Sequence, residues 1–239
     1  MRKTIRSFSL LLALCAAPLA YAGYEEGLSS FRAGNYGMAL SELMPAAKAG
    51  NADAQQLLGH MYYMGQGVVQ DFAQALAWHS KAAAQGQLES EYVIGTMYYS
   101  GKGVRQDYRG AKEWLQKAAS GGHADAQYML GAMYFTGKGV PQDYQQSVSW
   151  FRRAAEQGQS EAQRLLGLMH LYGVGGVPKD SVIAYMLWNL SAASGNMEAS
   201  DLRSDLAMQL TPRQIEEAQS LSTHWRPHTP LPTHSATGN

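Results

Sequence analysis

Aspartates and paired glycines are the residues of this chain whose types and spacing could support chemistry. Gly-x-Gly pairs start at Gly65, Gly101 and Gly137, and glycine pairs of this kind can cradle phosphate groups. Neither a Gly-x-x-x-x-Gly-Lys-Ser/Thr motif nor a Gly-x-Gly-x-x-Gly motif after a strand accompanies them, so we interpret them as turn glycines. The aspartates recur about every 36 residues, a spacing that favours helix N-caps over a metal or catalytic site. They are Asp71, Asp107, Asp143 and Asp180.

Histidine and cysteine add no recognisable site. His60, His79, His123 and His170 occupy four different phases of the sequence repeat described below, so they form no column. Cys15 is the only cysteine, which excludes zinc sites built from several cysteines. The sequence therefore predicts no catalytic residues, no metal site and no cofactor, and hence a protein that is not an enzyme.

One stretch of sequence is repeated four times. Ala52–Gln87, Leu88–His123 and Ala124–Gln159 align at a period of 36 residues. Ser160–Asn196 follows with one inserted residue in its glycine-rich loop. A fixed period of this length is typical of arrays of small helical units. Every copy also carries a glycine at one further shared position, which gives the column Gly59, Gly95, Gly131 and Gly167.

Each copy predicts two antiparallel helices. In the third copy, apolar residues between Ala126 and Tyr134, and again between Val148 and Ala155, recur at the three- and four-residue steps of an amphipathic helix. Gly131 falls inside the first of these helices, where glycine costs ~1 kcal/mol relative to alanine. A cost repeated in every copy implies that a neighbouring helix approaches too closely for a Cβ atom. The glycine column is therefore predicted to be structural.

The repeat resembles the Sel-one-like repeat, a relative of the tetratricopeptide repeat. The resemblance rests on the pattern A-x-x-x-L-G-x-M-Y-x-x-G-x-G-V-x-x-D-x-x-x-A-x-x-W-x-x-x-A-A-x-x-G in Ala54–Gly86. It covers Ala52–Asn196 strongly and the flanks weakly. The family implies an all-α fold, a right-handed α-solenoid of antiparallel helix pairs used for protein recognition, and it implies no chemistry.

The N-terminal residues predict export. Arg2, Lys3 and Arg6 precede an apolar run that is too short for a permanent membrane span, and Ala20-Tyr21-Ala22 fits a signal-peptidase site. We therefore expect residues 1–22 to be a signal peptide and the mature protein to be periplasmic. Leu14 is a poor match to a lipobox, so lipid anchoring at Cys15 is not expected. Lys and Arg total 19, as do Asp and Glu, so loss of the three basic residues leaves a net charge of −3. Neither nucleic acid nor an anionic membrane surface is predicted as a partner.

The flanking sequences predict caps for the array. Residues 23–51 match a degenerate repeat, in which Pro45 should bend or restart the second helix. Residues 197–225 predict a C-terminal helix pair, with Thr211-Pro212 as a helix start. Residues 226–239 contain three prolines and no apolar periodicity, so we expect a disordered tail without an anchor.

The first helix of each repeat should line a concave face, as the likeness to tetratricopeptide repeats implies. Residues at equivalent positions form three rows on this face, and the third row is large and mostly aromatic. Aromatic side chains can anchor a bound protein or peptide. The same rings could instead pack on the next repeat. The predicted partner-binding set is Gln56, His60, Tyr63, Tyr92, Thr96, Tyr99, Tyr128, Phe135 and Arg164, with Arg164 at its rim.

The sequence thus favours a non-enzymatic periplasmic protein that binds a protein partner. Among proteins with this resemblance, some are immunity proteins that neutralise secreted phospholipase toxins, and a small cysteine-free array suits that role as well as an adaptor role. A cysteine-rich branch of the family is linked to β-lactam binding and hydrolysis, but it carries a cysteine pair per repeat that this chain lacks. A purely structural spacer in the envelope is a third alternative.

Overall fold

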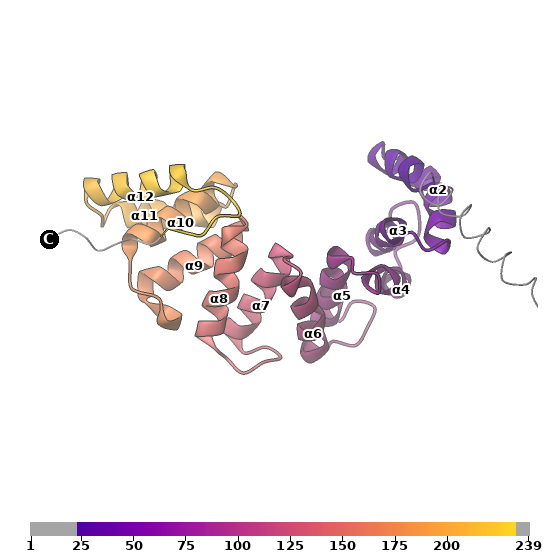
Figure 1. Ribbon diagram of the computed structural model, residues 1–239, viewed down its shortest axis with the longest axis horizontal. Helices are drawn as coiled ribbons and strands as arrows, with labels where there is room; N and C mark the ends of the chain where they lie inside the picture. The colour runs from indigo at the N-terminus through magenta and orange to yellow at the C-terminus, as the bar shows by residue number, and fades with distance from the viewer. Residues whose placement is uncertain (1–22, 233–239) are drawn as a thin grey trace, which may run out of the picture. The chain divides into compact units, whose positions relative to one another are not determined.

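The chain is an all-α solenoid of antiparallel helix pairs. The computed structural model describes residues 23–232, in which every regular element is a helix (Figure 1). The expected signal peptide, with Cys15, and residues 233–239 lie outside the described part. None of the described helices is long and apolar enough to cross a bilayer. The predicted fold class is confirmed.

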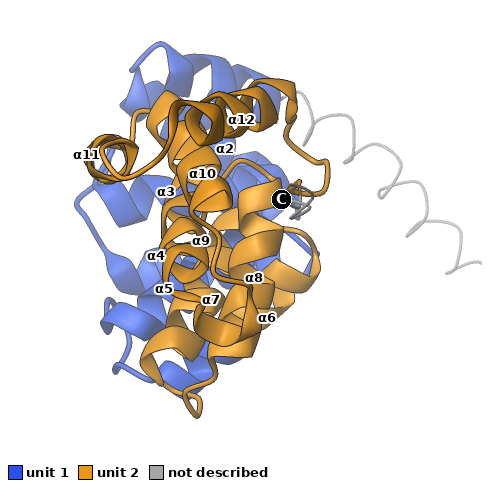
Figure 2. Cartoon of the chain, turned by 90° about the vertical axis from the view of Figure 1, so that its left-hand side faces the viewer, with its two compact units in different colours: residues 1–114 blue, residues 115–239 orange. Residues whose placement is uncertain are grey.

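The four repeats supply consecutive helix pairs, and additional helices flank them. The chain divides into two compact units, residues 1–114 and 115–239, which Figure 2 colours separately. We describe each unit by itself. The first helices of the repeats are α3 (Ala52–Met64), α5 (Leu88–Ser100), α7 (Ala124–Thr136) and α9 (Ser160–Tyr172). The second helices are α4 (Phe72–Ala83), α6 (Tyr108–Ser120), α8 (Tyr144–Glu156) and α10 (Ser181–Ala193). The flanks are a helical stretch over 23–32, α2 (Tyr36–Lys48), the short 3-10 helix η1 (Val174–Gly176), α11 (Met197–Ala207) and α12 (Pro212–His224).

The aspartate column caps the second helices. Asp71 Oδ1 accepts hydrogen bonds from the backbone N–H groups of Ala73 and Gln74, at 2.9 and 3.0 Å. Asp143 and Asp180 make the same pair of bonds at the starts of α8 and α10, and Asp107 accepts from the N–H of Arg109 at 2.9 Å. These carboxylates are occupied by backbone donors that would otherwise lack a partner, so the column has a structural role.

Within each unit, Gly-x-Gly pairs let a loop approach the preceding helix pair closely. The first glycine ends the first helix with a left-handed backbone, as at Gly65 with φ 71°. The second glycine lies against the start of an earlier helix. A Cβ atom on Gly103 would lie 2.7 Å from Phe72 Cβ, and one on Gly175 would lie 2.5 Å from the carbonyl oxygen of Tyr144. The glycine pairs are therefore packing devices.

The glycine column lets the two helices of a repeat touch. A Cβ atom on Gly59 would lie 2.7 Å from the ring of His79. On Gly131 it would lie 2.5 Å from the ring of Phe151, and on Gly167 it would lie 2.5 Å from the indole of Trp188. The three rings occupy the same position in their repeats, in the middle of the second helix. The helix crossing therefore has no space for any side chain at the glycine.

Buried glutamines join successive repeats. Gln55 Nε2 donates to the carbonyl oxygen of Ala47 at 3.0 Å, and Gln127 and Gln163 make the equivalent bonds to Ala119 and Ala155. Each bond links a first helix to the end of the second helix before it. Since buried amides are costly without partners, these bonds fix how one pair stacks on the previous one.

Pro45 does not interrupt its helix, which differs from the sequence-based expectation. Helix α2 runs from Tyr36 to Lys48 with Pro45 inside, and the N–H of Ala49 still bonds to the Pro45 carbonyl at 2.9 Å. The proline has no N–H group, so the backbone bond to the Ser41 carbonyl is missing. Burial of Leu43, Ala46 and Ala47 on either side of Pro45 holds this turn in place despite the missing bond.

Residues 226–232 pack against the helices, which corrects the prediction of a disordered tail for that part of 226–239. The N–H of His228 donates to the Glu156 carbonyl at 2.6 Å, and the N–H of Leu231 donates to Glu156 Oε1 at 3.2 Å. Leu231 is buried in the same apolar cluster as α8 and α10. The segment has an anchor after all, namely a single leucine that no periodic pattern marks.

We predict that Gly131→Ala destabilises the protein by ~1–3 kcal/mol, because the buried Phe151 ring cannot move away from a new Cβ atom. Gly37→Ala is the matched control, since Gly37 lies in α2 with nothing within 4 Å of a Cβ atom. Its higher helix propensity should leave stability unchanged or raised by up to ~1 kcal/mol. Denaturant unfolding followed by circular dichroism measures both. Equal effects of the two substitutions would contradict the close-approach interpretation.

Candidate functional site

A hollow of about 440 Å³ opens between the helical stretch 23–32 and the first helices α3 and α5. We call it the N-terminal hollow. All of its lining residues belong to the first unit. They are Tyr24, Leu28, Phe31, Asp53, Gln56, Leu57, His60, His79, Glu89 and Val93. Gln56 and His60 belong to the predicted partner-binding set, whereas the other lining residues were not predicted from the sequence.

His79 is the buried polar member of this lining. Only 1% of its surface is exposed, and its Nδ1 atom lies 3.0 Å from Ser90 Oγ. Burial lowers the pKa of His79 to about 4, the charge of nearby His60 acts in the same direction, and Glu89 opposes the shift. The ring is therefore neutral at pH 7. Its Nε2 atom is buried and has no hydrogen-bond partner in the described part of the chain.

Two carboxylates and an aromatic wall complete the hollow. Asp53 and Glu89 lie in the first turns of α3 and α5, where negative charge also favours the helix N-terminus. Gln87 Nε2 donates to Asp53 Oδ1 at 2.5 Å. The rings of Phe31 and His60 meet edge to face at 5.9 Å. No lysine or arginine is among the lining residues.

Arg164, which was predicted as a rim residue for binding, is engaged within the chain instead. Its guanidinium pairs with Glu161 at 2.9 Å and with Glu198 at 3.0 Å. Only 13% of its side-chain surface is exposed. The arginine therefore ties α9 to α11 and is not a free charge for steering a partner.

The third row of predicted binding residues packs partly on its own repeat. Tyr63 meets Phe72 edge to face at 5.2 Å, and Phe135 meets Tyr144 at 5.3 Å. Tyr99 and Tyr108 form the equivalent pair at 5.1 Å. In the first unit, Lys102 Nζ also reaches the Tyr63 hydroxyl at 3.2 Å. The rings remain accessible, and Phe135 is 39% exposed. These ring pairs lie within single repeats, which the alternative of packing on the next repeat did not foresee, and partner binding by this row stays a prediction.

The other predicted residues divide between the two units. Tyr92 and Thr96 lie half-buried on α5, where the Thr96 hydroxyl donates to the Val93 carbonyl at 2.7 Å. Tyr128 lies on α7, with its ring 5.9 Å from that of Phe151. The first unit therefore holds the N-terminal members of each row.

The second unit has two further hollows that the sequence did not indicate. One, of about 240 Å³, is lined by apolar side chains of α7, α8, α9 and η1, including Phe135, Leu168 and Tyr172. It lies beside the loop with the inserted residue, where Val174 stands at the position of Gln66, Lys102 and Lys138 in the earlier loops. That insertion is the signal by which sequence analysis could have found it.

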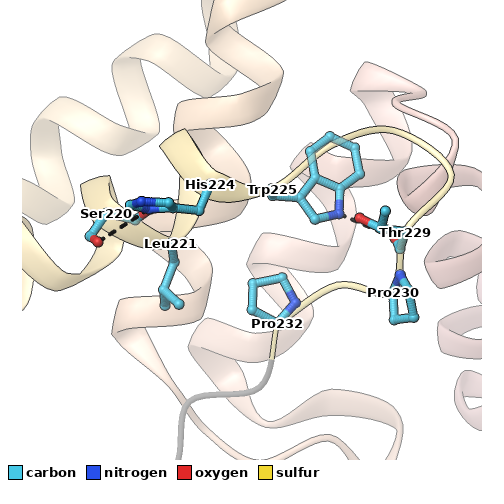
Figure 3. A pocket seen from close by; sticks show the side chains of 7 residues that line it. All are labelled: Ser220, Leu221, His224, Trp225, Thr229, Pro230 and Pro232. Carbon is cyan, nitrogen blue, oxygen red and sulfur yellow. Dashed lines mark hydrogen bonds between the residues drawn. The ribbon is translucent and has the colours of Figure 1, made fainter.

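The other hollow, of about 340 Å³, lies between α12 and residues 229–232 (Figure 3). Trp225 Nε1 donates to the Thr229 carbonyl at 3.2 Å, and His224 Nδ1 lies 2.7 Å from the Ser220 carbonyl. Figure 3 shows the indole turned toward Thr229 and away from His224. Polar groups that line this hollow thus form hydrogen bonds with nearby residues of the same segment. Within residues 23–232 no group of His, Asp and Glu is arranged to hold a metal ion.

The repeats match a family model along their whole length. The Sel1 repeat model matches residues 52–87, 88–123, 124–159 and 160–196, the same boundaries that the sequence period predicts. The chain belongs to the Sel1 repeat family. The resemblance inferred from the sequence is confirmed.

Solved structures of other Sel1 repeat proteins share the fold. A protective antigen of uropathogenic Escherichia coli with an SLR fold is 31% identical, with a TM-score of 0.77 over 90% of this chain. The match spans only 48% of that antigen's length. A Sel1 repeat protein from Oxalobacter formigenes is 32% identical, with a TM-score of 0.73 over 82% of this chain and 84% of its own.

An immunity protein from Pseudomonas aeruginosa shares the fold at 23% identity and a TM-score of 0.53, over 90% of this chain and 85% of its own. At that identity the likeness concerns the fold alone. No curated protein matches this chain in sequence.

We predict that the stability of the protein falls as the pH drops from about 6.5 to about 4. The folded chain holds His79 neutral until about pH 4, whereas in the unfolded chain its imidazole takes up a proton near pH 6.5, the ordinary pKa of histidine. Between pH 4 and pH 6.5 the unfolded state thus binds more protons than the folded state. The stability that neutral His79 contributes is therefore complete above pH 6.5 and lost toward pH 4. The loss should be about 3 kcal/mol.

Denaturant unfolding at several pH values measures this loss. His79→Phe is the control, since Phe151 fills the equivalent position of the third repeat. This variant should reduce the pH dependence between pH 4 and 6.5, and burial of His170, which also lowers the pKa of that ring, accounts for part of what remains. Parallel curves for the two proteins would show that His79 is not the group responsible.

Proposed function

We propose that this protein is a non-enzymatic, periplasmic binding scaffold that holds a protein partner on the face lined by its first helices. Sel1 repeats mediate protein–protein interaction, and four of them span residues 52–196 of this chain. The observation that carries the proposal is the N-terminal hollow, in which polar and aromatic side chains meet on the first-helix side of the first unit. The signal peptide predicted for residues 1–22 supports export.

An immunity role is the second candidate, favoured by the shared fold with the Pseudomonas aeruginosa immunity protein. In that role the partner would be a secreted phospholipase-type toxin that the scaffold inhibits by stoichiometric binding. If the captured partner is such an enzyme and loses its activity in the complex, this role is correct. A partner without enzymatic activity would favour an adaptor.

We predict that Tyr63→Ala and Phe135→Ala each weaken partner binding by ~1–3 kcal/mol, because accessible aromatics on a recognition face act as anchors. The partner is captured from envelope extract, purified and titrated against each variant. Gln74→Ala is the control, since Gln74 is an exposed residue of the second helix α4. All variants must first keep the parental helicity. Normal binding by both aromatic variants would contradict a site on the first-helix face.

We also predict that the purified protein hydrolyses neither esters, phospholipids nor β-lactams above the buffer rate. No nucleophile, base and orienting group are recognisable together in the sequence, and the paired cysteines of the β-lactam-linked branch are lacking. A turnover assay with purified protein tests this. A rate that disappears on a single Ser or His substitution would overturn it.

A further inference from the structure

In the first unit, the side chain of Lys102 covers a pair of aromatic rings. Tyr63 of α3 and Phe72 of α4 meet edge to face at 5.2 Å, and the loop after α5 brings Lys102 against both. The lysine Nζ atom donates to the Tyr63 hydroxyl at 3.2 Å and lies 5.3 and 5.8 Å from the centres of the two rings. With this cover, both rings are half-buried. The loop of one repeat thus places a long side chain over the rings of the repeat before it.

In the second unit, the equivalent ring pair has a valine in place of this cover. Phe135 of α7 and Tyr144 of α8 meet edge to face at 5.3 Å, and they are 39% and 40% exposed. The position of Lys102 is taken by Val174, which is uncharged and too short to reach over the rings. The position of Tyr63 is taken by Phe135 itself, which lacks the hydroxyl that accepts the lysine's hydrogen bond. Both members of the lysine–tyrosine contact are therefore apolar here.

The hollow of about 240 Å³ opens beside this ring pair, and we call it the apolar hollow. Leu168 and Tyr172 of α9 line it, where the second repeat has the polar residues Thr96 and Ser100. Val174 also lines it, so three positions that are polar in the second repeat are apolar around this one space. The Tyr172 hydroxyl is the one polar group among the lining side chains, and Tyr172 is 68% exposed. Apolar surface of this kind gains free energy only when an occupant removes it from water.

The lining restricts the chemistry of that occupant. A lysine or arginine would bury its charge against a wall that offers no carboxylate, which is costly. A large apolar side chain has no polar group to desolvate, and it buries the lining as well as itself. The volume lies below the ~300–1,000 Å³ of most small-molecule sites and suits a single side chain. Residues 233–239 include no large apolar residue, so they do not supply it.

We propose that the apolar hollow receives a large apolar side chain, such as leucine, from the protein partner. This side chain takes the place beside Phe135 that Lys102 takes over Tyr63 in the first unit, and it packs against Leu168 and Tyr172. The inference rests on the proposed function, because Phe135 belongs to the predicted partner-binding set on the first helices. It adds the location of one anchor and the chemistry that the partner must present there.

The test uses N-acetyl-leucine amide as the probe. N-acetyl-asparagine amide, which is polar but similar in shape, and N-acetyl-lysine amide are the controls. Each is titrated into the purified protein with ¹³C-labelled methionine methyl groups, and NMR follows the signal of Met169, which lines the hollow. The leucine probe should move this signal saturably and leave that of Met61, in the first unit, in place. The controls should bind about tenfold more weakly or not at all, because the lining offers nothing to a polar or charged group.

Two variants place the binding in the apolar hollow. Val174→Lys supplies the side chain that Lys102 has at the equivalent position, so it should cover Phe135 and weaken binding of the leucine probe about tenfold. Tyr172→Ser introduces the residue of the second repeat and should also weaken binding, because it removes one wall. Met197→Ser is the matched control, since it removes an 82% exposed apolar side chain at the start of α11, outside the lining.

All three variants must keep the parental helicity, and Met197→Ser should bind the probe as the parent does. Failure of the leucine probe to bind saturably would overturn the proposal. Equal binding of the leucine and asparagine probes, or unchanged binding of the leucine probe by Val174→Lys, would also overturn it.

Binding of the captured partner separates this inference from the proposed function. If Tyr63→Ala weakens partner binding but Val174→Lys and Tyr172→Ser do not, the first-helix face binds a partner without an apolar side chain in the hollow, and only the present inference fails. If neither these variants nor Phe135→Ala affect the partner, the proposed function fails and this inference fails with it. Weaker partner binding in Val174→Lys and Tyr172→Ser, together with weaker binding of the leucine probe, supports both.

Discussion

The contact between a helix glycine and a buried ring sets the geometry on which the rest of this fold depends. Gly131 against Phe151 and Gly167 against Trp188 leave no space for a Cβ atom, so the two helices of each repeat meet at a fixed separation. The glutamine bonds between successive repeats join helices that are held at that spacing. Gln163 reaches the Ala155 carbonyl, for example, only because both ends are held in place by the crossings on either side of it. By holding the two helices at this separation, the repeated glycine also fixes where residues that differ between the repeats are placed.

Periodicity made the repeats predictable, because a glycine or aspartate that recurs every 36 residues has one structural reason in every copy. Asp143 caps its helix, and Gly131 leaves space for the ring of Phe151. Both contacts lie within one copy of the repeat, so one copy explains them. The non-repeating parts carried no such signal. Leu231 is buried without any apolar pattern around it, and the helical stretch 23–32 contributes Phe31 to the hollow although it matches the repeat poorly.

The candidate site was predictable only in part, for a related reason. The helical period showed that Gln56 and His60 share a face, but it does not show which neighbour a long side chain selects. Arg164 belongs to the same row, yet two glutamates on different helices hold it inside the chain. The third-row rings likewise turn toward their own repeat, as Tyr63 does toward Phe72. These choices depend on contacts between helices, which position in a helix alone does not determine.

Two positions differ between the first and the second unit in burial and in charge. At the ring position above the glycine, Phe151 fills the crossing at no polar cost, whereas His79 brings a nitrogen whose burial without a partner costs about 1–3 kcal/mol. At the neighbouring position, Arg164 neutralises two carboxylates, whereas the equivalent Gln56 brings no charge to its own pair. Both differences lie in the lining of the N-terminal hollow. The first unit therefore departs from the second where the helices of a repeat cross and where successive first helices meet, and these are the positions that a helical period cannot rank.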